Sequence, residues 1–253
     1  MSFMKCLPEQ ILKHFKSLLL CILTALCTNA LAGEVTVAVT NNFDFTAEEL
    51  KTQFEAISGH TVTLVKGPSS AHYNRILQGE NFDIFLSDDA ERPGNLEANE
   101  LGRRFTYASA KLVLWSVDNR RLTPDLLQEK DFQLLAITNP RLSPFGRAAE
   151  EFLKSIDVWE DIQDKLVIGD NIGQTYQFAI SGDVELALIA YSQIIYGIYM
   201  QAGSHWQIPD TYYTPMEHQG VLLTDNPAAQ EFIQFMQSTR GQQIILGNGY
   251  LVP

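Results

Sequence analysis

The chain has 253 residues, 45% of them hydrophobic, and a formal net charge of −12 at neutral pH. This acidic balance argues against nucleic acids and anionic membranes as partners, because their negative charge repels an acidic surface. The length is sufficient for one or two domains that each bury a hydrophobic core.

The first 32 residues have the pattern of a cleaved export signal. Lys5, Lys13 and Lys16 make a basic start, the apolar segment 17–27 follows, and 30–32 reads Ala-Leu-Ala, a typical cleavage site. The apolar segment is shorter than the roughly 20 residues that a membrane-spanning helix needs. A retained membrane anchor is the alternative interpretation. All cysteines of the chain lie within the first 32 residues, so the mature protein has no thiol for a disulfide or a metal.

The first part of the mature chain alternates predicted strands with predicted helices. The first helix has Thr46 followed by Glu49, as in a capping box, and Gly59 ends it. This alternation predicts a parallel sheet with right-handed crossovers. The predicted strands are 35–40, 61–65 and 83–86, and the predicted helices are 47–57 and 71–78.

A second α/β series follows a long apolar strand predicted at 111–117. Two sheet domains joined by two crossings fit this order better than one large domain. We therefore predict a signal peptide at 1–32, a first lobe made of 33–116 and 217–253, and a second lobe at 117–216. The further predicted strands are 132–137, 166–168, 186–190 and 220–223, and the helices are 147–156, 174–180, 228–237 and 242–246.

Several predicted strands end in a small polar turn that opens a helix. Asn41-Asn42 and Ser69-Ser70 are two such turns, and 143–146 and 169–173 are two more that contain glycine. A helix N-terminus has unpaired N–H groups and a partial positive charge, so several that converge make an anion site without a central Lys or Arg. Open α/β sheets bind ligands at the carboxyl ends of their strands. Taken singly, each turn could instead be only a helix cap.

These turns offer hydrogen-bond donors of different kinds. Asn41 and Asn42 can offer amide NH₂ groups and Ser69 a hydroxyl. Phe145 and Ile172 would contribute main-chain N–H groups, because the glycines that follow them allow close approach. The alternative for Phe145 and Ile172 is that they only pack the start of a helix.

Seven segments, taken in order and spacing, resemble the periplasmic molybdate-binding proteins of ABC importers. The segments are VTVAVTNNF, GPSSAHYNRI, FDIFLSDDAERP, RFTYASAKLVLWS, ITNPRLSPFGRAAEEFL, IGDNIGQTYQFAISGDVELALIAYSQI and GQQIILGNGYLVP. The resemblance implies a type II periplasmic binding protein fold of the α/β class. Each lobe is then a mainly parallel sheet flanked by helices, and the ligand cleft lies between the lobes.

The resemblance also implies a function and a location. The protein would capture molybdate, and tungstate, in the periplasm and deliver it to an inner-membrane ABC permease. It would be a monomer without a cofactor, would bind no cation directly and would catalyse no reaction. Molybdate, tungstate and sulfate are dianions with acceptors only, whereas phosphate keeps a proton and requires a carboxylate acceptor.

The resemblance implies ligand residues position by position. Asn42, with Asn41 beside it, places the chain in an asparagine-type subgroup. Tyr191 matches a tyrosine whose hydroxyl serves as a donor in the serine-type members, and the asparagine subgroup often lacks it. Tyr191 could therefore contact only the wall between the lobes. The implied set is Asn41, Asn42, Ser69, Phe145, Ile172 and Tyr191.

Two alternatives to molybdate capture remain at this stage. The same fold could bind sulfate or another tetrahedral oxyanion, since the size of the cavity decides between them. A secreted hydrolase that uses Asp88 and Asp89 as a carboxylate pair is less favoured, because such residues commonly cap helices. The histidines of the mature chain lack the paired spacing of metal ligands.

Overall fold

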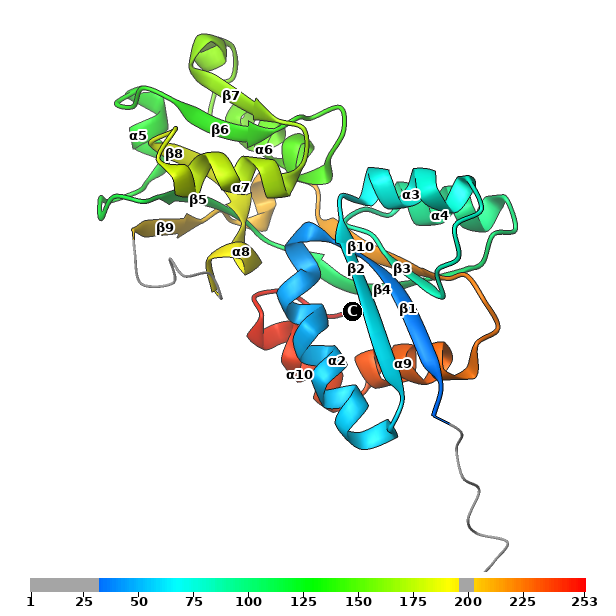
Figure 1. The fold of residues 1–253 in the computed structure, drawn as a ribbon. Helices are drawn as coiled ribbons and strands as arrows, with labels where there is room; N and C mark the ends of the chain where they lie inside the picture. The colour runs from blue at the N-terminus through cyan, green and yellow to red at the C-terminus, as the bar shows by residue number, and fades with distance from the viewer. Residues whose placement is uncertain (1–31, 196–202) are drawn as a thin grey trace, which may run out of the picture. The chain divides into compact units, whose positions relative to one another are not determined.

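The computed structural model describes residues 32–195 and 203–253, and from Gly33 onward they belong to one unit (Figure 1). The predicted signal peptide, apart from Ala32, lies outside the described residues. Among the described helices, none is both long and apolar enough to cross a membrane. Two five-stranded sheets organise this unit.

The first sheet has the strand order β2-β1-β3-β10-β4. β1 is parallel to β2 and β3, whereas β10 is antiparallel to both of its neighbours. β10 therefore runs against the other four strands. The strands are β1 (Glu34–Thr40), β2 (Thr61–Gly67), β3 (Ile84–Leu86), β4 (Arg103–Ala110) and β10 (Met216–Leu222).

Helices cover both faces of this sheet. Alternate residues of a strand point to opposite faces, and accordingly Val37 packs in one apolar cluster with Phe54 and Phe232, while Ala38 packs in another with Ile76 and Leu96. The helices on the first side are α2 (Asp44–Ser58), α9 (Pro227–Gln237) and α10 (Thr239–Gly247), and those on the second are α3 (Ser69–Leu77) and α4 (Glu91–Ala98).

The second sheet repeats the plan with the order β7-β6-β8-β5-β9. β6 is parallel to β7 and β8, and β5 is the reversed strand, antiparallel to β8 and β9. The strands are β5 (Leu112–Ser116), β6 (Leu135–Thr138), β7 (Leu166–Gly169), β8 (Leu186–Ala190) and β9 (Ser204–Gln207). The α/β class and the two-sheet architecture are thus confirmed.

The second sheet is also covered on both faces. Leu114 of β5 packs in the cluster that contains Phe152 of α6, and its neighbour Val113 packs in the cluster that contains Ala179 of α7. The helices here are α5 (Pro124–Gln128), α6 (Pro144–Ser155), α7 (Ile172–Ser181) and α8 (Tyr191–Ile195), with the 3-10 turns η2 (Glu160–Lys165) and η3 (Asp210–Tyr212).

The first crossing between the sheets occurs at Lys111, between β4 and β5. We had expected lobe 1 to extend to 116, but Leu112–Ser116 is hydrogen-bonded within the second sheet. The difference arises because β4 was not predicted: its charged start and small residues make no continuous apolar run. The chain returns between η3 and β10. Division into two lobes remains a proposal.

One further local prediction differs from the structure. The first helix was expected to begin after Thr46, but the 3-10 turn η1 (Asn41–Phe43) leads directly into α2 at Asp44, and Thr46 is buried inside the helix. The end of that helix is confirmed: Gly59 has a φ of 74°, and its N–H donates to the Glu55 carbonyl oxygen.

Candidate functional site

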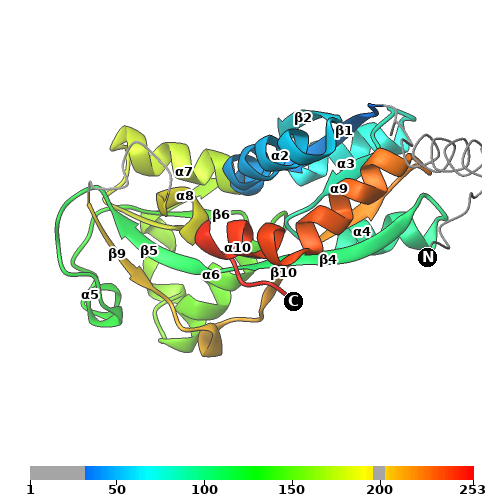
Figure 2. The same cartoon turned by 90° about the horizontal axis from the view of Figure 1, so that it is seen from below.

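The polar turns of the two sheets meet where the parallel strands end. β1 leads into η1, and α7 and α8 of the other sheet lie beside this turn (Figures 1 and 2). Asn41 Nδ2 donates to Asn171 Oδ1 over 3.4 Å, and Ser192 Oγ donates to the Asn42 carbonyl oxygen over 3.1 Å. These bonds join the first strand end of one sheet to the helix starts of the other.

Asn42 is almost fully buried in this contact region. Its Nδ2 lies 2.8 Å from His218 Nε2 and 3.3 Å from the Tyr250 hydroxyl. Tyr250 also donates to the Asn42 carbonyl oxygen and lies 2.8 Å from Ser192 Oγ. Asn42 Oδ1, by contrast, is buried without a hydrogen-bond partner among the described residues.

His218 is a neutral partner for Asn42. Its ring is fully buried, and burial lowers the pKa of the imidazole from 6.5 to about 3. Nδ1 lies 3.3 Å from the Met216 carbonyl oxygen, which can only accept, so Nδ1 carries the proton and Nε2 accepts from Asn42. The Phe145 ring stands perpendicular to the imidazole at 6.0 Å, so His218 also touches the start of α6.

Ser69 opens α3 and is buried next to Asp88. The Asp88 N–H donates to Ser69 Oγ over 3.1 Å, which holds the two residues side by side. Burial raises the pKa of this carboxyl from 3.8 to about 6, and the neighbouring charge of Asp89 adds to the rise. Because β3 ends just before these residues, Asp88 lies at the same edge of the sheet as Asn42.

Asp89 has a different role from Asp88. It forms an ion pair with Arg92, and its Oδ1 accepts from the Arg92 N–H over 2.7 Å, as in a helix cap. Arg92 Nη2 in turn donates to the Leu142 carbonyl oxygen, which belongs to the second sheet's connections. The two carboxylates are therefore engaged by different partners.

Phe145 and Ile172 lie at the first turns of α6 and α7, and their side chains are buried in the core. Only their main chains are thus available to a ligand. The Phe145 N–H lies 3.3 Å from Ser143 Oγ, the cap of α6, whereas the cap of α7, Asn171, accepts from Gln174. The first N–H groups of a helix have no partner within the helix, which leaves the Ile172 N–H as a donor.

Tyr191 faces a different environment from the other predicted ligands. Its ring packs at 5.7 Å from the His205 ring, and Lys111 Nζ lies 5.8 Å from its centroid. The next residue, Ser192, is the one that bonds Asn42 and Tyr250. The structure thus brings Asn41, Asn42, Ser69, Phe145 and Ile172 to the facing strand ends and sets the Tyr191 ring beside Lys111.

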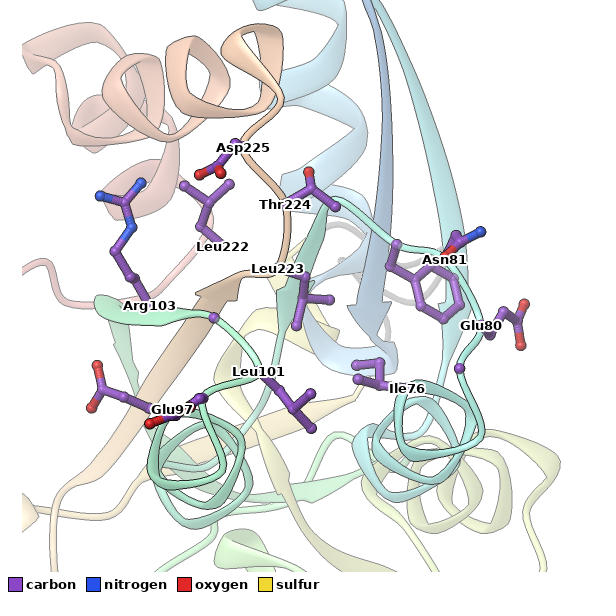
Figure 3. Close-up of a pocket in the computed structure, with 14 residues that line it drawn as sticks. Ile76, Glu80, Asn81, Glu97, Leu101, Arg103, Leu222, Leu223, Thr224 and Asp225 are labelled. Atoms are coloured by element: carbon purple, nitrogen blue, oxygen red, sulfur yellow. The ribbon is translucent and has the colours of Figure 1, made fainter.

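Two hollows lie at the surface of this unit, and one of them adjoins the strand ends. One of about 690 Å³ lies at the opposite edge of the first sheet, between the ends of α3 and α4 and the segment after β10 (Figure 3). Its carboxylates outnumber its one arginine, so it does not suit an anion. The charged residues that line it are Glu80, Glu97, Glu100, Arg103 and Asp225. The other, about 480 Å³, adjoins the strand ends and is lined by Asp89, Pro144, Arg147 and Glu217 among others.

Comparison with known proteins gives the family. Residues 35–251 match the family described as bacterial extracellular solute-binding protein. The chain belongs to this family. Another solute-binding protein, the molybdate-binding protein ModA of Rhodobacter capsulatus, is 37% identical over 239 residues, which cover 92% of this chain and 94% of that protein.

Two further comparisons concern Azotobacter vinelandii. Its molybdate-binding protein ModA is 37% identical over 232 residues, covering 87% of this chain and 91% of that protein. The solved structure of the Azotobacter vinelandii periplasmic molybdate-binding protein is similar with a TM-score of 0.80 at 30% identity, covering 87% of this chain and 99% of that chain. The solute-binding family and its two-sheet fold therefore extend over nearly the whole described part of this chain.

Sequence reasoning missed three residues that the structure places around Asn42. His218, Tyr250 and Ser192 lie 176, 208 and 150 positions along the chain from it. Tyr250 and Ser192 stand in two of the segments that carry the family resemblance, which was the available signal for them; His218 stands in none of these segments. Among the described residues, no cluster of three or more His, Cys, Asp or Glu side chains could hold a metal ion.

Proposed function

We propose that this protein captures molybdate in the periplasm and delivers it to an inner-membrane ABC permease. The observation that carries the proposal is the meeting of buried, neutral polar groups with helix N-termini at the strand ends of both sheets, in a chain 37% identical to two ModA proteins. Such a site attracts an oxyanion through oriented N–H dipoles and needs no compensating cation.

The proposed donors come from both sheets. From the first, the Ser69 hydroxyl and the N–H groups at the start of η1, next to Asn42, face the ligand. From the second, the Ile172 and Phe145 N–H groups do so, with Phe145 shared with its Ser143 cap. Asn42 itself is held by His218 and Tyr250. We leave Tyr191 outside this set, because its described ring neighbours, His205, Lys111 and Gly249, include none of the proposed donors.

Closure of the two sheets around the anion supplies the binding energy. A buried hydrogen bond to a charged group contributes about 1.5–3 kcal/mol, which offsets the dehydration of a dianion only when several act together without water. The bonds from Asn41 to Asn171 and from Ser192 to Asn42 already tie the two strand ends together. We infer a bind, close, dock and open cycle of the hinge type, without catalysis.

Tungstate is included in the proposal because it is also a tetrahedral dianion with acceptors only. Sulfate has the same charge but is smaller, so it leaves donors in a molybdate-sized cavity unmet, at about 1–3 kcal/mol each. We therefore propose molybdate and tungstate as ligands and regard sulfate as a weak competitor.

The proposal is tested by thermal unfolding with molybdate, tungstate, sulfate and phosphate in parallel. A ligand present at about 100 times its Kd stabilises the folded protein by about 2.7 kcal/mol. We expect a clear rise in Tm with molybdate and tungstate, little with sulfate and none with phosphate. Ser69→Ala should lose most of the molybdate shift, whereas the matched change of its exposed neighbour, Ser70→Ala, should keep it.

Equal shifts with all four anions would contradict a selective oxyanion site. A full molybdate shift in Ser69→Ala would place the site elsewhere on the molecule.

A further inference from the structure

Asp88 is an acidic side chain inside a site that otherwise offers neutral groups. It is buried at the carboxyl end of β3, and its N–H donates to Ser69 Oγ over 3.1 Å. Ser69 is a proposed donor to the oxyanion. A dianion held by Ser69 would therefore lie next to a second negative charge whenever Asp88 is ionised.

The hydrogen bonds of Ser69 make the conflict specific. Its hydroxyl has one proton, and Ser69 Oγ already accepts from the Asp88 N–H. That proton is the only hydrogen that the Ser69 side chain can offer to an oxyanion. The Asp88 side chain, held next to Ser69 by the backbone bond, is then buried, ionised and beside a dianion. A buried carboxylate in that position becomes protonated rather than staying charged.

The charged and titratable groups around Asp88 do not remove the conflict. Arg92 of α4 pairs with Asp89, so its charge is already engaged. Tyr107 of β4 and Tyr250 of the C-terminal segment face Asp88 and are both held in their neutral form, their pKa values raised mainly by burial. His218, in ring contact with both tyrosines, is neutral as well. No unpaired cation among the described neighbours balances Asp88.

A second acceptor at the same strand ends also lacks a donor. Asn42 Oδ1 is buried without a partner among the described residues, while Asn42 Nδ2 is turned to His218. A ligand with acceptors only cannot satisfy this oxygen. Asn42 Oδ1 can therefore accept a hydrogen bond from a further donor at these strand ends.

We propose that Asp88 takes up one proton as the oxyanion binds, so that the protein binds molybdate and a proton together. One O–H bond forms on the carboxylate with a proton from solvent, and the site gains one negative charge on binding instead of two. The neutral carboxylic acid then acts as a further donor in the site. Asp88 thereby determines how affinity depends on pH. The inference rests on the proposed function, since it requires that the oxyanion bind at Ser69.

Calorimetric titration of molybdate in buffers of different ionisation enthalpy tests this proton uptake. At about pH 7.5, above the Asp88 pKa of about 6, we expect the wild-type protein to take up close to one proton per molybdate. Between about pH 7 and about pH 8 its Kd should rise about tenfold, because molybdate stays a dianion while Asp88 must be protonated. Asp88→Asn, which copies the neutral form, should take up no proton and show a constant Kd. Glu91→Gln, the matched control, removes an exposed carboxylate from the start of α4 and should keep the proton uptake.

Each outcome has a distinct meaning. Molybdate binding by the wild type without proton uptake would overturn the inference and leave the proposed function standing. Proton uptake that persists in Asp88→Asn would have the same two consequences. Tight phosphate binding would show that Asp88 accepts a proton from the ligand, and would overturn it too. If neither protein bound molybdate at any pH, the proposed function itself would fail. Should Asp88→Asn not fold, the wild-type proton count alone decides.

Discussion

His218 shows how a single neutral side chain can set the orientation of a binding-site residue. Because Nδ1 donates to the Met216 carbonyl oxygen, Nε2 is left as an acceptor and holds the Asn42 amide with its nitrogen toward the ring. A protonated imidazole would repel that amide nitrogen and would place a buried charge against Tyr107, Tyr250 and Phe145.

Replacement of His218 should change the acid stability of the protein. The imidazole has a pKa of about 3 when folded and 6.5 as its ordinary value, so the unfolded state binds more protons between these limits. His218 therefore lowers stability as pH falls below about 6.5. In His218→Gln, which keeps an acceptor for Asn42, the free energy of unfolding should fall by about 2 kcal/mol less than in the wild type between about pH 7 and about pH 5.

The measurement is urea unfolding of both proteins at the two pH values. Asp88, whose pKa is raised, changes the stability of both proteins in the opposite direction to His218, so its contribution cancels when the two proteins are compared. Identical losses of stability in the two proteins would show that His218 is not held neutral.

At the residue scale, sequence reasoning found side chains but not their partners. Asn41, Asn42 and Ser69 follow predicted strands, and the carboxyl ends of parallel strands meet at one edge, so their proximity could be predicted. That Asn42 Nδ2 turns to His218, or that Ser69 bonds Asp88, depends on long-range packing that no local pattern encodes. The same holds for Tyr191 and Ser192, neighbours in sequence whose side chains have different contacts.

At the element scale, helix starts carry the contact between the sheets. α7 begins at Ile172 against η1, and Gly173 lies close to Asn41. A Cβ atom there would lie 2.8 Å from Asn41 Nδ2 and 3.1 Å from Asn171 Oδ1. A methyl group at this position would therefore push α7 and η1 apart.

We predict that Gly173→Ala weakens molybdate binding about tenfold or more while the protein stays folded. The backbone at Gly173 is that of an ordinary helix, and alanine favours helices, so the fold itself tolerates the change. Displacement of the Asn41 contact costs about 1.4 kcal/mol or more if closure is impaired, which is a factor of ten in affinity. Titration of molybdate and thermal unfolding measure the two effects.

Gly247→Ala is the matched control, since it lies in α10 with nothing within 4 Å of its added Cβ. Wild-type affinity in Gly173→Ala would contradict the role that we give to this helix contact.

Strands and helices whose apolar residues follow a regular pattern could be predicted from the sequence, and those without such a pattern could not. β1 and β8 are apolar strands and were placed within a residue of their bounds. β4 and α4 were missed because Arg103–Ala110 mixes charged and small residues and Glu91–Ala98 contains both Pro93 and Gly94. The error at the first lobe boundary follows from this, since β5 appeared to be the continuation of the first sheet.

At the scale of the whole molecule, the two sheets have the same design. In each sheet, one reversed strand lies among four strands that share a direction. The carboxyl ends of the parallel strands therefore lie at one edge of each sheet. The bonds from Asn41 to Asn171 and from Ser192 to Asn42 show that these two edges face each other. A net charge of −12 is compatible with an anion ligand, because surface charge is screened over about 8–10 Å whereas N–H dipoles act at contact.

The most direct measurement is the crystal structure of the protein with molybdate, located by the anomalous scattering of molybdenum. We predict a single strong peak between the first sheet's strand ends, at Ser69, and the first turn of α7, at Ile172, with the Asp88 carboxyl beside it. A peak in the acidic hollow of Figure 3, or none at the facing strand ends with molybdate in excess, would contradict the account.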